Sequence, residues 1–228
     1  MSVAKSLLSG STDGQLIKVA ATSTPGTTIH TADASNIEEI HLFAYNSHTA
    51  DVKLTVEWGG TTSPDDLLEY TIPFKDGLII AIPGFALTNS LVVKAFASVT
   101  NVVYIAGFTN DIGATAQTVS KEIFSGSTDG RPVKPTATST PGTTIHTAHS
   151  SELDEIWAWA MNYNAANEAI TIEWGSTGAD HQILQTVIGE NGGQLIIPGL
   201  PLTNSGTLKI FSGTAAVNIF GYVNRYTA

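Results

Sequence analysis

Histidine offers this chain its widest choice of chemistry, because one side chain can bind metal, shuttle protons or hold a fixed hydrogen bond. Two of the six histidines, His30 and His146, occupy the same place in a repeated TTIHTA segment. A metal site needs three or four ligands at about 2 Å from one ion, and neither histidine belongs to an HxH, HxxxH or HExxH pattern. The other four are not repeated: His41, His48, His149 and His181. We expect a structural, hydrogen-bonded histidine; a ring of His30 around an oligomer axis is the metal-binding alternative.

Carboxylates are the second candidate group. Adjacent acids occur at Glu38–Glu39, Asp65–Asp66 and Asp154–Glu155. A glycosidase needs two carboxyl groups about 5 to 9.5 Å apart across a cleft, whereas neighbours on a strand point to opposite faces. The repeated acid is Glu57, with Glu173 as its counterpart, each followed by Trp-Gly. Its phase predicts an outward, solvated carboxylate or one paired with another subunit.

The segment SGSTDG occurs at residues 9–14 and again at 125–130. It matches neither a phosphate-binding GxxxxGK[ST] loop nor a GxSxG nucleophile elbow, and it lacks the oxygen ligands of a calcium loop. We interpret it as a turn. Because the chain also contains no cysteine, thiol catalysis and thiolate metal sites are excluded. The sequence therefore predicts no catalytic residue, no metal and no cofactor, and a protein that is not an enzyme.

Charge narrows the choice of partner. The 228 residues include 10 Lys+Arg and 20 Asp+Glu, a formal net charge of −10. Such a chain lacks the cationic surface that nucleic acid or an anionic membrane requires. No window is apolar enough for a membrane span or a signal peptide, so we expect a soluble protein made in the cytoplasm. Charged residues make up only 13%, about half the usual ~25%, which suggests a surface partly covered by other molecules.

An internal duplication divides the chain. The segment TSTPGTTIHTA begins at residue 22 and again at residue 138, the same offset of 116 positions that separates the two SGSTDG segments. Glu-Trp-Gly, Ile-Pro-Gly and Leu-Thr-Asn-Ser recur in the same order. A period this long is a whole domain. We predict one domain at residues 1–111, a linker at 112–120 and a second domain at 121–228.

Both copies alternate like strands. Leu54, Val56 and Trp58 lie on one side of their segment, and the counterpart keeps the same phase; period two with β-branched and aromatic residues is typical of a half-buried strand. Turn residues such as Thr-Pro-Gly and Ile-Pro-Gly separate the segments. In the first copy we expect strands at residues 15–20, 27–31, 37–45, 51–58, 67–72, 78–82, 91–97 and 102–108. About eight strands per copy predict an all-β protein of two tandem antiparallel β-sandwiches, jelly-roll-like or immunoglobulin-like.

One predicted strand has no polar face. In residues 37–45, Ile40, Leu42 and Ala44 alternate with His41, Phe43 and Tyr45, whereas a strand with one wet face alternates apolar with polar residues. The second copy shares this feature, with Ile156, Ala158 and Ala160 opposite Trp157, Trp159 and Met161. Either another segment of the chain covers the second face, or it is an interaction face for a subunit or ligand. The candidate residues are His41, Phe43, Tyr45, Trp157, Trp159 and Met161.

The repeated text, SGSTDG, TSTPGTTIHTA, EWG, IPG and a final G-(F/Y)-x-N, resembles small all-β structural proteins of tailed bacteriophages. These motifs consist of turn and strand residues and cover both halves of the chain. The resemblance implies a virion protein, here a tandem duplicate, and most directly a capsid decoration (cement) protein. Its expected partners are the major capsid protein or another virion protein and further copies of itself, in a homo-oligomer such as a trimer. The alternative is a carbohydrate- or receptor-binding fibre or tail accessory protein.

Overall fold

The computed structural model describes residues 2–187, 189, 192–214 and 216–227. Within these ranges the secondary structure is β-strand apart from one short 3-10 turn, η1 (Ala179–His181), so the predicted all-β class is confirmed. No helix of this described part is long and apolar enough to cross a membrane. The chain divides into two compact units, Met1–Gln117 (unit 1) and Thr118–Ala228 (unit 2).

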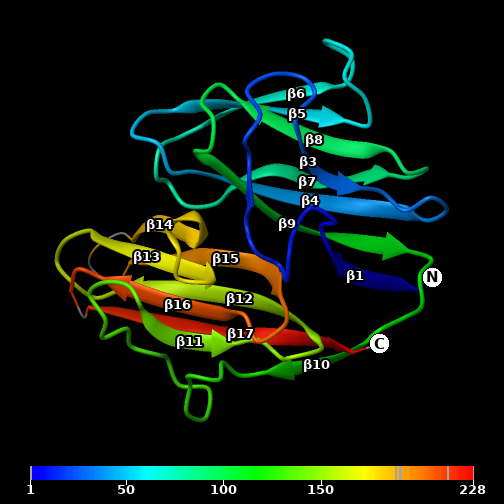
Figure 1. Cartoon of the computed structure of the whole chain (residues 1–228). Helices are drawn as coiled ribbons and strands as arrows, with labels where there is room; N and C mark the ends of the chain where they lie inside the picture. Colours follow the sequence, from blue (N-terminus) through cyan, green and yellow to red (C-terminus); the bar gives the residue numbers. More distant parts are fainter. Residues whose placement is uncertain (1, 188, 190–191, 215, 228) are drawn as a thin grey trace. The chain divides into compact units, whose positions relative to one another are not determined.

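Unit 1 consists of two antiparallel sheets (Figure 1). The first has the order β1 (Val3–Leu7), β9 (Val103–Ile112), β4 (Ile37–Asn46), β7 (Ile79–Leu87), and the short β2 (Ile17–Lys18) also pairs with β9. The second has the order β3 (Thr27–Thr31), β8 (Val92–Ala97), β5 (Val52–Trp58), β6 (Leu67–Ile72).

Unit 2 repeats this arrangement. Its first sheet has the order β10 (Thr118–Glu122), β17 (Val217–Thr227), β12 (Leu153–Asn162), β15 (Gly192–Leu202). Its second has the order β11 (Thr143–Thr147), β16 (Thr207–Ser212), β13 (Glu168–Gly175), β14 (Gln182–Val187). When the eight main strands of a unit are counted in chain order, both units have sheets 1-8-3-6 and 2-7-4-5. This is the double Greek key of a jelly roll, so the structure selects the jelly-roll alternative over the immunoglobulin-like one.

The core of unit 1 lies between its two sheets. Ile40, Leu42 and Ala44 on β4 join Val52, Leu54 and Val56 on β5 in one buried cluster. In unit 2 the matching residues of β12, Ile156, Ala158 and Ala160, are also fully buried. At about 25 cal/mol per Å² of apolar surface removed from water, this inward face supplies the main stabilisation. The side chains on the opposite face of β4 and β12 do not belong to this core between the sheets.

The Ile-Pro-Gly motif is not a turn between strands, as the sequence suggested, but a bulge inside β7 and β15. The pairing of β4 with β7 shifts register between Ile40 and His41, where Gly84 is the extra residue. Gly84 and its counterpart Gly199 have positive φ, +101° and +77°, a conformation that glycine adopts without strain. A bulge of this kind bends the strand and re-aims the neighbouring side chains.

The repeated glutamates are buried, which corrects the expectation of a solvated outward carboxylate. Glu57 and Glu173 do lie on the outer side of their strands, but the TSTPG segment folds back over them. The Gly26 N–H donates to Glu57 Oε2 at 2.8 Å, and the Gly142 N–H donates to Glu173 Oε2 at 2.8 Å. Both carboxylates are 0% exposed. A buried carboxylate needs such donors. In each unit the glutamate of the Glu-Trp-Gly motif therefore holds the TSTPG loop against its strand.

The structure adds a first strand to each unit that the alternation did not indicate. β1 and β10 pair antiparallel with the last strand of their own unit. The segment 112–120, predicted to be a linker, includes the last residue of β9 and the first three residues of β10. The expected strand at residues 15–20 is reduced to the two residues of β2.

Candidate interaction face

The six predicted residues lie on the outward face of the first sheet in each unit. His41, Phe43 and Tyr45 alternate along β4 with core residues, and Trp157, Trp159 and Met161 do so along β12. Trp159 is 36% exposed and Met161 37% exposed, while Trp157 is half-buried. Phe43 and Tyr45 are buried and His41 is half-buried. The exposed part of the predicted set therefore belongs to unit 2.

The neighbouring strands add aromatic and apolar residues that the sequence analysis did not select. On β17, Phe220 is opposite Trp159 and Tyr222 is opposite Trp157, and on β15 Leu195 is opposite Trp159. Residues directly opposite in an antiparallel pair point to the same side. Phe220 and Leu195 are each 40% exposed. We refer to Trp157, Trp159, Met161, Leu195, Phe220 and Tyr222 as the aromatic face of unit 2.

Three rings of this face have similar orientations. The ring centroids of Trp157 and Trp159 are 6.2 Å apart with planes at 21°, and those of Trp157 and Tyr222 are 6.5 Å apart at 20°. Trp159 and Tyr222 are 6.1 Å apart at 35°. Rings in direct face-to-face contact would be about 3.5–4.0 Å apart, so these rings are offset sideways. The arrangement offers a broad apolar surface.

Glycines make room for this face. A Cβ on Gly199 would come within 2.7 Å of the Trp157 ring, and one on Gly84 within 2.8 Å of the His41 ring. The final G-(F/Y)-x-N motif has a second tight approach: a Cβ on Gly221 would lie 2.0 Å from the Trp157 carbonyl oxygen, and one on Gly107 lies 2.1 Å from that of His41. The repeated glycines therefore position Trp157 in unit 2 and His41 in unit 1.

Polar groups border the aromatic face of unit 2. The Asn224 amide donates to Glu155 Oε2 at 2.7 Å, and the Tyr226 hydroxyl donates to the same oxygen at 3.3 Å. Burial and the charge of Glu155 raise the pKa of Tyr226 to about 12, so this hydroxyl remains a donor at neutral pH. The Lys121 ammonium lies 3.8 Å from the centre of the Tyr222 ring, a cation–π distance. Apolar rings bordered by charged and amide groups are typical of binding surfaces.

Unit 1 has a different set at the same positions. The His41 and Phe108 rings are stacked with centroids 4.6 Å apart, and the Lys5 ammonium lies 3.4 Å from the centre of the Phe108 ring. His41 Nε2 is 2.7 Å from Glu39 Oε1. Phe108 and Tyr222 are the aromatic residues of the two G-(F/Y)-x-N motifs. That motif was the sequence signal for these missed residues, because its strand is the direct neighbour of β4 or β12.

His30 and His146 perform the structural role that the sequence predicts. His30 Nδ1 accepts the Ser9 N–H at 3.0 Å, and Nε2 lies 2.8 Å from Glu38 Oε2. His146 accepts the Ser125 N–H at 3.1 Å and lies 3.0 Å from Asp154 Oδ2. An imidazole that accepts at Nδ1 is left to donate at Nε2. Each histidine therefore ties the SGSTDG turn to the carboxylate on β4 or β12, with both ring nitrogens in use.

The carboxylate beside this histidine has different neighbours in the two units. In unit 2, Arg225 Nε donates to Asp154 Oδ1 at 2.7 Å and Nη2 donates to Oδ2 at 3.0 Å. Although burial opposes it, hydrogen bonds from His146, Arg225 and the His149 N–H hold the pKa of Asp154 well below its usual range. In unit 1 the residue opposite Glu38 is Asp111. Burial, with the charges of Asp33 and Glu38, raises the pKa of Asp111.

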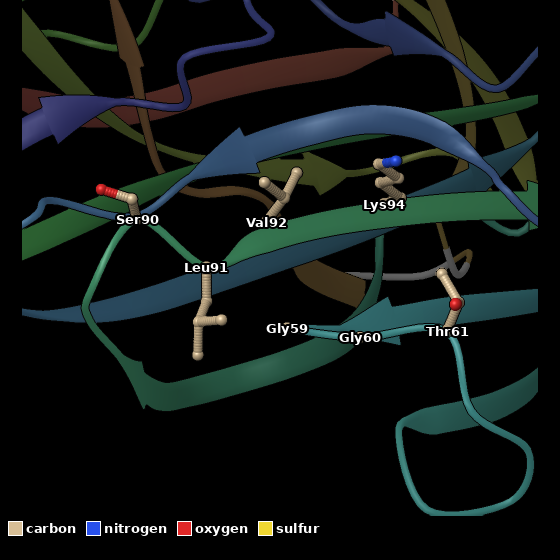
Figure 2. A pocket seen from close by; sticks show the side chains of 7 residues that line it. All are labelled: Gly59, Gly60, Thr61, Ser90, Leu91, Val92 and Lys94. Carbon is tan, nitrogen blue, oxygen red and sulfur yellow. The ribbon is translucent and has the colours of Figure 1, made fainter.

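A shallow depression of about 210 Å³ lies on unit 1 (Figure 2). It is lined by Gly59, Gly60, Thr61, Ser90, Leu91, Val92 and Lys94. Small-molecule sites usually enclose about 300–1,000 Å³ and combine several convergent polar groups, whereas Lys94 is the one charged residue here. Among the described residues, no group of three or more His, Asp or Glu could hold a metal ion. The aromatic face of unit 2 is therefore the better candidate site.

Comparison with known proteins gives weak similarities. No family model matches the chain, and no curated protein matches it. A tandem CBM22-1–CBM22-2 domain of Paenibacillus barcinonensis Xyn10C is 13% identical with a TM-score of 0.23, covering 98% of this chain and 97% of that one. An infectious bursal disease virus structure is 11% identical with a TM-score of 0.28, covering 99% and 71%. The VP2 subviral particle of that virus is 12% identical with a TM-score of 0.27, also covering 99% and 71%. Scores this low establish neither a shared fold nor a shared function.

Proposed function

We propose that this chain is a non-enzymatic virion structural protein of a tailed bacteriophage, a capsid decoration (cement) protein that binds and stabilises the head shell. The observation that carries this proposal is the aromatic face of unit 2, an apolar surface on the outside of a sheet with a polar border. An aromatic side chain buries roughly 150–250 Å² when fully covered. The four most exposed members of this face are 36–40% exposed, so they supply the centre of an interface of about 800 Å² per partner, and residues around them supply the rest.

The use of the repeated polar residues supports a binding role. His30 and His146 hold the SGSTDG turns, and Glu57 and Glu173 hold the TSTPG loops. The repeated motifs therefore stabilise the fold of each unit, and this fold supports the aromatic face of unit 2. Jelly rolls serve this purpose in viral capsid and lectin domains.

Duplication fits a partner with many equivalent positions. When two linked units dock on one lattice, the second binding event becomes intramolecular and raises the overall avidity by about 10²–10⁴. A capsid provides such a lattice. The low content of charged residues, 13%, keeps the desolvation cost of a large contact small.

The test is co-sedimentation of the purified chain with empty heads of the phage or prophage that encodes it. We expect saturable binding and heads that resist heat better when decorated. Replacing a central tryptophan removes an interface anchor that contributes about 2 kcal/mol or more, so Trp159→Ser should weaken binding about 30-fold. Phe74→Ser is the matched control, because Phe74 is an exposed aromatic residue (54%) outside this face. Absence of binding, or equal binding of both variants, would contradict the proposal.

A second candidate function is carbohydrate or receptor binding by a fibre or tail accessory protein. The near-parallel rings of Trp157, Trp159 and Tyr222, next to Glu155 and Asn224, resemble the combination of stacking surface and hydrogen-bonding groups that a sugar requires. This function predicts saturable binding on a glycan array that Trp159→Ala abolishes. Sedimentation velocity at low and high concentration separates the two functions further, because the decoration protein should form a homo-oligomer such as a trimer.

A further inference from the structure

The first sheet of each unit ends at an equivalent edge strand, β1 in unit 1 and β10 in unit 2. The two edges differ in what binds their outward peptide groups. β1 and β10 are edge strands, and they pair with β9 and β17 in the same register: Lys5 is opposite Asn110, and Lys121 is opposite Asn224. In an edge strand every second residue turns its N–H and C=O away from the sheet. In unit 1 Lys5 is such a residue, and the shared register assigns the same orientation to Lys121 and, two residues earlier, to Val119.

In unit 1 a side-chain amide occupies this edge. Gln117 Oε1 accepts the Lys5 N–H at 2.8 Å, and Gln117 Nε2 donates to the Lys5 carbonyl oxygen at 3.3 Å. A carboxamide has the same acceptor and donor as a peptide group. Gln117 therefore makes the pair of hydrogen bonds that one residue of an added strand would make. The edge of this sheet has the geometry to accept an amide from outside.

In unit 2 the described residues of the same unit provide no such amide at this edge. Within that part of the chain, the backbone of Val119 and Lys121 pairs with β17 alone. The side chains of Thr118 to Lys121 are exposed, and Val119 and Ile123 are each 51% exposed. The strand pairs without a register shift or a proline. The opposite edge strand of the sheet, β15, has two register shifts and contains Pro198 and Pro201, features that natural sheets use to prevent edge pairing.

We propose that the β10 edge is a β-augmentation site that binds an extended segment of another polypeptide through its peptide groups. The side chains define the sequence class. Val119 and Lys121 lie on one face of β10, where Lys121 covers Tyr222, and Ile123 follows the last strand residue in the same alternation. Cross-strand neighbours favour apolar next to apolar and opposite charges together. The segment that fits carries apolar, acidic and apolar residues at alternate positions. The site uses the peptide groups of the β10 edge and not the rings of the aromatic face, which Lys121 borders, so peptide binding can fail without the proposed function and the reverse.

The experiment titrates the full chain with a blocked heptapeptide of this pattern, Thr-Val-Thr-Glu-Thr-Val-Thr, followed by NMR. On binding, amide exchange should slow at Val119 and Lys121, whose N–H groups point outward, and not at Ser120, whose N–H already pairs with β17. Lys121→Pro removes one outward donor while leaving the β17 ladder intact, and should weaken peptide binding about tenfold. Lys121→Ala keeps the backbone donor and should bind more tightly than Lys121→Pro.

Two results would overturn the inference. One is the lack of slowed exchange at Val119 and Lys121 at millimolar peptide. The other is equal peptide affinity of wild type and of a folded Lys121→Pro chain. Should Lys121→Pro fail to fold, Val119→Pro tests the same prediction at the neighbouring outward donor, and the exchange measurement needs no variant.

Discussion

The ion pair between Arg225 and Asp154 allows the sharpest test of how unit 2 is held together. Asp154 is fully buried, and Arg225 makes two hydrogen bonds to it at 2.7 and 3.0 Å. Removing one partner of a buried pair costs about 3–5 kcal/mol, because a charge is left uncompensated. His146 and the His149 N–H still reach Asp154, so we take the lower end, about 3 kcal/mol, for Arg225→Ala.

For a unit of this size that loss corresponds to a fall in Tm of about 12 °C, at about 4 °C per kcal/mol. Differential scanning calorimetry of the full chain measures it. Lys53→Ala is the control: it breaks an exposed pair with Glu69, 54% exposed on both sides, which contributes at most about 1 kcal/mol. The double variant Asp154→Leu/Arg225→Met removes both charges and should recover much of the loss. An Arg225→Ala effect no larger than that of Lys53→Ala would refute the reasoning.

The pH dependence follows from the direction of the pKa. Because the pKa of Asp154 in the folded chain lies well below its usual range, the carboxylate contributes stability that is complete above the unfolded value of about 3.9 and is lost as pH falls below it. The difference between wild type and Arg225→Ala, measured by urea unfolding, should therefore shrink as pH falls below about 4. A difference that is constant down to low pH would mean that Arg225 acts through packing alone.

Further variants test the remaining contacts. Asp111→Arg should stabilise unit 1 by about 1 kcal/mol in urea unfolding at pH 7, because it places a cation opposite Glu38 as in unit 2; a loss of stability would contradict this. Since the pKa of Asp111 is raised, wild-type unit 1 should also gain stability from this group as pH falls toward about 3.9, and the Asp111→Arg chain should lack that gain. Gly199→Ala should cost about 1–3 kcal/mol. Gly213→Ala is the unaffected control in thermal unfolding, because a Cβ there would meet only the Glu168 carboxylate, at an ordinary contact distance of 3.8 Å. His30→Ala should cost about 2 kcal/mol, because it leaves the Ser9 N–H without its acceptor and leaves Glu38 Oε2 with the Asp33 N–H alone. An unchanged urea midpoint would exclude the structural role.

Much of this fold could be predicted from local pattern. The period-two alternation of β4, β5 and their counterparts places Ile40, Leu42 and Ala44 in the core, and the duplication allows each copy to support the strand assignment of the other. β1 and β10 were missed because VAKSL and TVSKE lack that alternation, as edge strands need only one neighbour. The burial of Glu57 was missed because it depends on a loop that returns from Gly26, a contact that strand phase cannot show.

The candidate face was partly predictable for the same reason. Alternation shows that Trp157 and Trp159 share the non-core side, but strand order decides which residues join them. Tyr222 lies more than sixty positions after Trp157 in the sequence, and the pairing of β12 with β17 brings the two side by side. Asp111 in unit 1 and Arg225 in unit 2 occupy equivalent positions, and strand pairing was likewise needed to show that each lies opposite an acid, Glu38 or Asp154.

Electron cryomicroscopy of heads incubated with the chain tests the central claim most directly. The proposed function predicts density for the chain on the lattice, with β12 and β17 of unit 2 turned toward the shell and Trp159 inside the contact. Bare shells at saturating protein, or bound chains whose Trp159 faces solvent, would contradict it.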